Sequence, residues 1–192
     1  IRDRPYTIQN YLADQITVPR FSTELPEFAE AEKAVQARID HLMGIKGKKS
    51  VDSIHKELGH IMWEYVGMGR TEEGLKTALK LLKDIRKEFE TNLFIPGSTE
   101  GVNIELEKAL RLNDFITMGE LIAYDALNRN ESCGGHFREE YQTEEGEAKR
   151  DDENYFYVSC WEYQGSDDVA PVLYKEPLVY EAIKVQTRNY KS

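Results

Sequence analysis

Residues 104–128 read IELEKALRLNDFITMGELIAYDALN, a long run with no proline. Apolar side chains recur in it at spacings of three and four residues and reach most of the way around a helix of 3.6 residues per turn. We therefore expect a single long helix here. Because polar residues do not interrupt the run, we expect this helix to be the central and most buried one of the chain.

Three more amphipathic helices are expected before this run. From Pro26 to about residue 45, apolar residues recur every three or four positions, and a proline suits the first helical position because its missing N–H has no partner there. Another helix should follow Ser50 and end near Gly67. Thr71 can cap the next helix, whose expected core-facing positions are Leu75, Leu79, Leu82, Ile85, Phe89 and Leu93.

Short glycine-containing connections join these helices, so consecutive helices should run antiparallel. After Asn130 the composition changes to glycines and then to an acidic stretch, residues 139–154, for which we expect a mobile surface loop. YFYVSCWEYQ and PVLYKEPLVY, beyond it, are rich in residues that favour strands. The predicted fold is mainly α, an antiparallel three- to four-helix bundle with a short carboxy-terminal β-hairpin and an extended tail.

Charge and composition exclude several classes of function. The net charge of -10 would repel the phosphates of a nucleic acid, and no basic stripe offsets it. No apolar run approaches the roughly 20 residues that cross a bilayer, so we expect no direct membrane insertion. Glycine-rich nucleotide-binding fingerprints are absent as well. The two cysteines are too few for a disulfide framework and fit a reducing compartment.

Two histidine patterns suggest a metal site, but each has a simpler interpretation. His55 and His60 lie five residues apart, whereas two ligands on one helix face need a spacing of four. Cys133 and His136 form Cys-x-x-His, which is half of a zinc site or an activated thiolate, but no second pair accompanies them. We therefore expect ordinary exposed or capping histidines and a glycine turn with a structural thiol.

The segment NRNESCGGHFREEYQTEEGEAKRDDEN, residues 128–154, resembles a signature of the succinate dehydrogenase/fumarate reductase flavoprotein subunit. In that family a long helix ends in a Glu-Ser-Arg-Gly-Ala-His turn, and Arg-Asp-Asp precedes an aromatic strand. The order of helices before it and Tyr174-Lys-Glu-Pro-Leu also look like that family. The matching residues here are Glu131, Ser132, Gly134, Gly135, His136, Arg138, Arg150, Asp151 and Asp152.

The resemblance implies an intact parent that interconverts succinate and fumarate with FAD and passes electrons to an iron–sulfur subunit on a membrane anchor subunit. That parent would be cytoplasmic and peripheral at the inner face of the cell membrane. Its catalytic and flavin-binding groups lie in domains that would precede Ile1. The resemblance therefore predicts no catalytic, cofactor-binding or metal-binding residue in this chain, which alone should be inactive, and it assigns the nine matching residues a structural or interface role. We expect His136 and Arg138, which follow the glycine turn, to donate hydrogen bonds to Asp151 or Asp152 and so to tie the base of the acidic loop.

The corresponding domain limits are residues 1–25 as a linker and short helix from the missing flavin-binding domain, 26–130 as the helical bundle, and 131–192 as the glycine turn, acidic loop, hairpin and tail. Cys133 stands where the family has arginine, so any ion pair of that arginine is missing or replaced. The stretch from Arg138 to Arg150 is also longer than usual. The alternatives are a related flavoprotein such as L-aspartate oxidase, which has a similar turn, and a free-standing helical interaction module.

Overall fold

The computed structural model describes residues 4–14, 21–166 and 169–186 and divides into two units, residues 1–41 and 42–192. Helix α1 (Arg4–Asp14) and most of α2 (Pro26–Gly44) belong to the first unit. Of the described side chains between residues 7 and 41, only Ile39 is even half-buried. The helix predicted from Pro26 to about residue 45 is confirmed, but Phe28 and Val35 on its apolar face are exposed.

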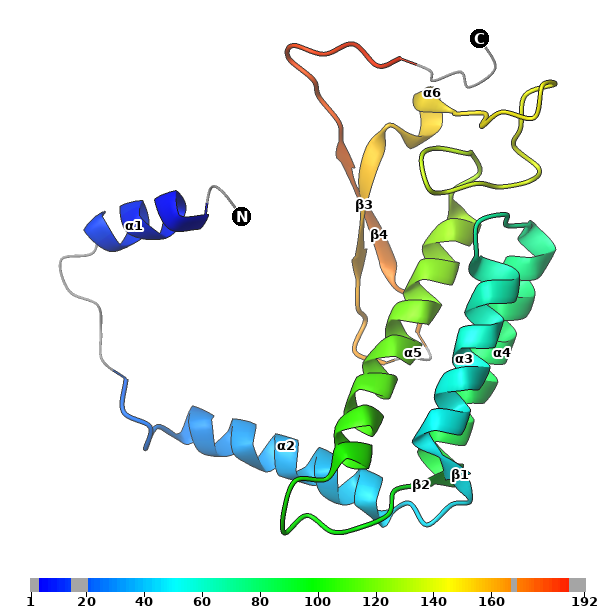
Figure 1. The fold of residues 1–192 in the computed structure, drawn as a ribbon. Coiled ribbons are helices and arrows are strands. Elements are labelled where there is room, and N and C mark those ends of the chain that lie inside the picture. Colours follow the sequence, from blue (N-terminus) through cyan, green and yellow to red (C-terminus); the bar gives the residue numbers. More distant parts are fainter. Residues whose placement is uncertain (1–3, 15–20, 167–168, 187–192) are drawn as a thin grey trace. The chain divides into compact units, whose positions relative to one another are not determined.

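The second unit contains an antiparallel bundle of α3 (Val51–Val66), α4 (Glu72–Asn92) and α5 (Ile104–Asn128), which lie side by side (Figure 1). Side-chain caps begin all three helices. Ser50 Oγ accepts from the Ser53 N–H at 3.2 Å, Thr71 Oγ1 from Gly74 N–H at 3.0 Å, and Asn103 Oδ1 from Leu106 N–H at 3.0 Å. The predicted start of α4 at Thr71 is thus confirmed.

The bundle core is formed by one face of each helix. On α4 the buried residues are Leu75, Ala78, Leu82, Ile85 and Phe89. Leu79, which we expected in this stripe, is only half-buried, because the fully buried Ala78 occupies the helix position that faces the core. The stripe is therefore confirmed except at this one position.

Helix α5 buries only one face, contrary to the prediction from its nearly continuous apolar run. Its buried side includes Gly119, where an added Cβ would lie 3.2 Å from the sulfur of Met62 on α3. Phe115, Met118 and Ile122 are instead between 42% and 52% exposed. Helices α3 and α4 are the described helices that pack against α5, and these three side chains lie outside the face of α5 that the two helices bury.

The start of α3 is held beside the end of α4 by a short parallel pairing of β1 (Lys49–Ser50) with β2 (Leu93–Phe94). Gly47 immediately precedes this pairing and donates its N–H to Leu93 O at 3.0 Å. An added Cβ at Gly47 would lie 2.0 Å from the backbone of Asn92. Glycine is required here because the two backbones approach so closely.

Beyond the bundle come a short helix, α6 (Asp152–Tyr155), and the antiparallel strands β3 (Tyr157–Glu162) and β4 (Val172–Pro177). The predicted hairpin is confirmed. Trp161 on β3 donates its indole N–H to Asp125 Oδ1 on α5 at 2.7 Å and packs edge-on against Tyr124. Through these contacts the hairpin lies against the carboxy-terminal half of α5.

The acidic stretch folds back on itself. Gln142 and Ala148 form an antiparallel bridge, and Thr143 N–H donates to Glu147 O at 2.8 Å. The predicted fold class, mainly α with a carboxy-terminal hairpin, is confirmed. Within the described ranges, no helix combines the length and apolar character that crossing a membrane requires.

Candidate functional site

Three helix ends meet at one end of the bundle: the carboxy-terminal ends of α3 and α5 and the amino-terminal end of α4 (Figure 1). Helix ends leave backbone groups without intrahelical partners and carry partial charges, negative at the carboxy-terminal end. Charged and polar side chains from the connections between helices and from the glycine turn bind these groups or one another. We call this set the helix-end cluster; it comprises Arg70, Arg129, Glu131, Ser132, His136, Arg138 and Glu140.

Arg138 binds the end of α5. Its side chain is fully buried, and its guanidinium Nη1 donates to Ala126 O at 3.1 Å and to Leu127 O at 3.4 Å. Its Nε donates to Glu140 Oε2 at 3.1 Å, and the group lies over the ring of Tyr141. A buried cation is therefore neutralised by a carboxylate and by the negative end of a helix.

Glu140 connects Arg138 to α4. Its second carboxylate oxygen, Oε1, accepts the N–H of Glu72, in the first turn of α4, at 2.5 Å. Burial opposes ionisation, but the hydrogen bonds from the Glu72 N–H and from Arg138 keep the pKa of Glu140 below its ordinary value. Glu140 is thus an anion at the positive end of a helix.

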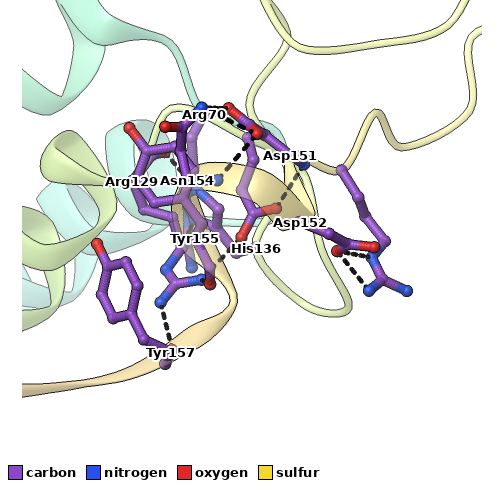
Figure 2. Close-up of polar contacts among 10 residues, drawn as sticks. Arg70, Arg129, His136, Asp151, Asp152, Asn154, Tyr155 and Tyr157 are labelled. Carbon is purple, nitrogen blue, oxygen red and sulfur yellow. Dashed lines mark hydrogen bonds and ion pairs between the residues drawn. The ribbon is translucent and has the colours of Figure 1, made fainter. Parts of the chain in front are cut away.

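Arg70 binds the end of α3 and the ring of His136. Its Nε donates to Val66 O at 3.1 Å and Gly67 O at 3.0 Å, and its Nη1 lies 2.9 Å from His136 Nδ1. His136 Nε2 lies 2.9 Å from Arg129 O (Figure 2). Because a guanidinium only donates and a carbonyl only accepts, the ring is neutral and carries its proton on Nε2.

Glu131 and Arg129 connect the turn to the hairpin. The buried carboxylate of Glu131 pairs with Arg129 Nη1 at 2.7 Å and accepts the Asp151 N–H at 2.9 Å. The Arg129 guanidinium also donates to Tyr155 O and Tyr157 O, both at 3.2 Å, and lies near both tyrosine rings. Figure 2 shows Arg129 beside these two tyrosines. Arg129 therefore holds the start of β3 next to the end of α5.

Ser132 closes the glycine turn from inside. Its fully buried hydroxyl donates to Arg138 O at 3.1 Å and accepts the Arg138 N–H at 2.8 Å. Cys133 N–H donates to His136 O at 2.8 Å, and Gly134 has a φ of 59°, which favours glycine. Gly135 completes this turn with a negative φ, and the Cys133 side chain points outward and is exposed.

The expected contacts of His136 and Arg138 with Asp151 or Asp152 are not formed. Asp152 instead pairs with Arg150, with Oδ1 3.0 Å from Nε, and is largely exposed. Asp151 caps α6 by accepting the Asn154 N–H at 3.2 Å. Arg138 instead points into the bundle, where it donates to carbonyls at the end of α5. Glu131, rather than His136 or Arg138, binds the base of the acidic loop by accepting the Asp151 N–H.

Three members of the helix-end cluster, Arg70, Arg129 and Glu140, were not singled out from the sequence. Arg129 directly follows the predicted helix 104–128, where a cation favours the negative helix end. This position could have identified Arg129 as a candidate from the sequence alone. Arg70 also binds the end of the helix just before it, but its contact with His136 and that of Glu140 with Glu72 join residues more than sixty positions apart, and local sequence offers no signal for these two contacts.

The cluster is self-contained. In the described part of the chain, no buried side-chain nitrogen or oxygen lacks a hydrogen-bond partner. No group of three or more histidine, cysteine or acidic side chains among these residues has the geometry of a metal site. His55, of the first histidine pattern, stacks on Phe115.

Comparison with known proteins places these features in a family. The family described as fumarate reductase flavoprotein C-term matches residues 55–190, which include the bundle except the first turn of α3, and the whole helix-end cluster. The fumarate reductase flavoprotein subunit of Proteus vulgaris is 29% identical over 148 residues, covering 75% of this chain and 24% of that protein. An L-aspartate oxidase of Nicotiana tabacum is 37% identical over 88 residues, covering 46% of this chain and 13% of that protein.

The solved Mycobacterium smegmatis Sdh1 in complex with UQ1 has the same fold, with a TM-score of 0.70 and 22% identity over 88% of this chain and 26% of that one. The chain thus spans about a quarter or less of the length of each of these relatives. The matched region contains most of α3, all of α4, α5 and α6, the glycine turn and the hairpin, whereas α1 and α2 lie before it. The chain belongs to the carboxy-terminal domain family of the fumarate reductase/succinate dehydrogenase flavoprotein subunits.

Proposed function

We propose that this chain is the non-catalytic helical and carboxy-terminal part of a flavoprotein subunit whose intact parent interconverts succinate and fumarate. The family match over residues 55–190 is the observation that carries this proposal. The name of the Proteus vulgaris relative, a fumarate reductase flavoprotein subunit, supports the reaction. The role of the chain is to brace the rest of the parent and to contribute to its subunit contacts.

The parent would use FAD, held by a flavin-binding domain elsewhere in the same polypeptide. It would pass electrons to an iron–sulfur subunit and a membrane anchor subunit, as a cytoplasmic protein peripheral at the inner face of the membrane. Solved structures with this fold include a quinol-fumarate reductase and the Sdh1 complex of Mycobacterium smegmatis, and they support such partners. The same proposal divides the chain into three parts. These are a linker and short helix at residues 1–25, the helical bundle at 26–130, and the glycine turn, acidic loop, hairpin and tail at 131–192.

The contacts of the helix-end cluster support a structural rather than a catalytic role for the family turn. Arg138 is bound to two helix carbonyls and Glu140, and Glu131 to Arg129 and a backbone N–H. A general base or a substrate anchor needs a polar group free to meet the substrate. These side chains are occupied by contacts within the chain, and their removal should therefore affect folding or assembly first.

The proposal is tested by purifying the 192-residue chain and recording its absorbance in the flavin bands and its turnover of succinate and fumarate. We expect no flavin absorbance and no turnover above buffer. The parent protein from the same source, assayed in parallel, should carry FAD and turn over. Stoichiometric flavin or measurable turnover in the isolated chain would refute the non-catalytic assignment.

The second candidate is a parent of the L-aspartate oxidase type, which the identity to the Nicotiana tabacum protein favours. The two candidates differ in substrate and in partners. Assay of the parent with succinate and with L-aspartate, followed by co-purification with an iron–sulfur subunit, separates them. Oxidation of L-aspartate without such a subunit would favour the second candidate.

A further inference from the structure

His136 joins two segments that are far apart in the sequence. Its Nδ1 accepts from Arg70, in the connection between α3 and α4, and its Nε2 donates to the carbonyl of Arg129, directly after α5. The backbone continues the first junction, because Arg70 N–H donates to Phe137 O at 3.0 Å and Glu139 N–H donates to Arg70 O at 2.8 Å. The glycine turn is thus attached to α3 through this ring and one backbone bridge.

Positive charge surrounds the ring. Arg70, Arg129 and Arg138 all act on it electrostatically. The nearby carboxylates have other partners. Glu131 pairs with Arg129, and Glu140 pairs with Arg138. Asp125 accepts a hydrogen bond from Trp161 and also attracts Arg70 electrostatically. Glu139 lies beside Gly69 rather than against the imidazole. Both ring nitrogens already have partners, so a second ring proton would gain no acceptor and would displace Arg70.

We propose that His136 is a proton-sensitive joint: the neutral ring holds Arg70 against the glycine turn, and protonation releases this contact. The inference goes beyond the proposed function and does not rest on it. Release would free the guanidinium of Arg70 from the turn while its bonds to the end of α3 remain possible. The junction between α3 and the turn would then depend on the backbone bridge alone.

The direction of the pH effect follows from the environment of the ring. Burial, followed by the charges of the three arginines, lowers the pKa of His136 below its ordinary value, although the hydrogen bond to Arg129 O opposes this. A histidine whose folded-state pKa is lowered stabilises the fold fully above its unfolded-state pKa, about 6.5, and this contribution is lost as the pH falls below that value. The joint should therefore hold at neutral pH and loosen in acid.

The test is amide hydrogen exchange of the whole chain by NMR between pH 7.5 and 5, corrected for intrinsic exchange, together with titration of the histidine ring signals. The reporters are the amides of Arg70 and Glu139, which form the backbone bridge. Their protection should fall by up to about tenfold for each pH unit between about 6.5, where the ring of the opened junction titrates, and the lower His136 midpoint of the closed junction, and it should level off below that midpoint. The amide of Leu82, in the middle of α4, serves as the internal reference.

His136→Gln is the matched variant, because an amide side chain can donate and accept but does not titrate in this range. It should abolish the acid-dependent step, whereas His60→Gln, at an exposed position of α3, should retain it. If His136→Gln disrupts the junction at every pH, Arg70→Gln replaces it. Removing that neighbouring charge should raise the His136 midpoint and shrink the step. An unchanged step in His136→Gln, an unshifted midpoint in Arg70→Gln, or a ring that titrates without loss of protection would overturn the proposal.

Discussion

Two arginines of the family turn have opposite surroundings. Arg138 is fully buried and satisfies two carbonyls at the end of α5, whereas Arg150 pairs with a largely exposed carboxylate. A buried carbonyl that loses its donor costs about 1–3 kcal/mol, while an exposed ion pair contributes about 0–1 kcal/mol. Burial, rather than charge, should therefore decide which arginine stabilises the fold.

Arg138→Met tests this difference. It should lower the free energy of unfolding by at least about 2 kcal/mol, because it leaves the α5 carbonyls without their donor and removes the cation paired with Glu140. Arg150→Met, the control, should cost less than about 1 kcal/mol. Urea denaturation followed by circular dichroism measures both. Equal losses for the two variants would contradict the distinction.

At the scale of elements, the caps and apolar stripes are local, and this is why they could be predicted. Thr71 acts on Gly74 three residues away, and the stripe of α4 follows from the helical period. The period does not specify which of two neighbouring apolar residues faces the core. At positions 78 and 79 the smaller residue does: Ala78 is fully buried and Leu79 is half-buried.

Leu82→Ala should destabilise the chain by about 2–5 kcal/mol, since Leu82 is fully buried and its removal leaves a cavity. Leu79→Ala is the matched control on the same helix. It should cost less than about 2 kcal/mol, because a half-buried side chain withdraws less apolar area from water. Thermal and urea unfolding of the two variants provide the comparison. A cost below about half a kcal/mol for Leu82→Ala would mean that this stripe does not face the core.

At the scale of the whole molecule, the bundle and hairpin could be predicted from the sequence, but the helix-end cluster could be predicted only in part. Four of its residues could be named, Glu131, Ser132, His136 and Arg138, but not their pairings. Its pairings connect Arg70 to His136 and Glu72 to Glu140 across the complete bundle. Such contacts depend on where α3, α4 and α5 end relative to one another. The same limitation explains why the expected bonds to Asp151 and Asp152 were wrong while the residues themselves do lie at the base of the acidic loop.

The last prediction distinguishes an interface role for this region from an internal one. Asp152 is exposed and bonds to Arg150 alone among the described contacts of its side chain, so Asp152→Asn should change the stability of the isolated chain by less than about 1 kcal/mol. If the Arg150–Asp152 pair orients the acidic loop against another part of the parent, the same change should reduce flavin retention or subunit assembly there. Glu153→Gln, which alters the neighbouring exposed carboxylate, is the control.

Three outcomes of this comparison are informative, because the isolated chain reports internal stability and the parent reports assembly as well. Loss in the parent alone assigns Asp152 to an interface, since the fragment has no partner to lose. Equal loss in both makes the pair an internal brace, despite the exposure of its carboxylate. A parent that assembles and retains flavin but turns over more slowly would contradict the non-catalytic role assigned to the region, because a structural contact that leaves assembly intact has no direct means of slowing the chemistry.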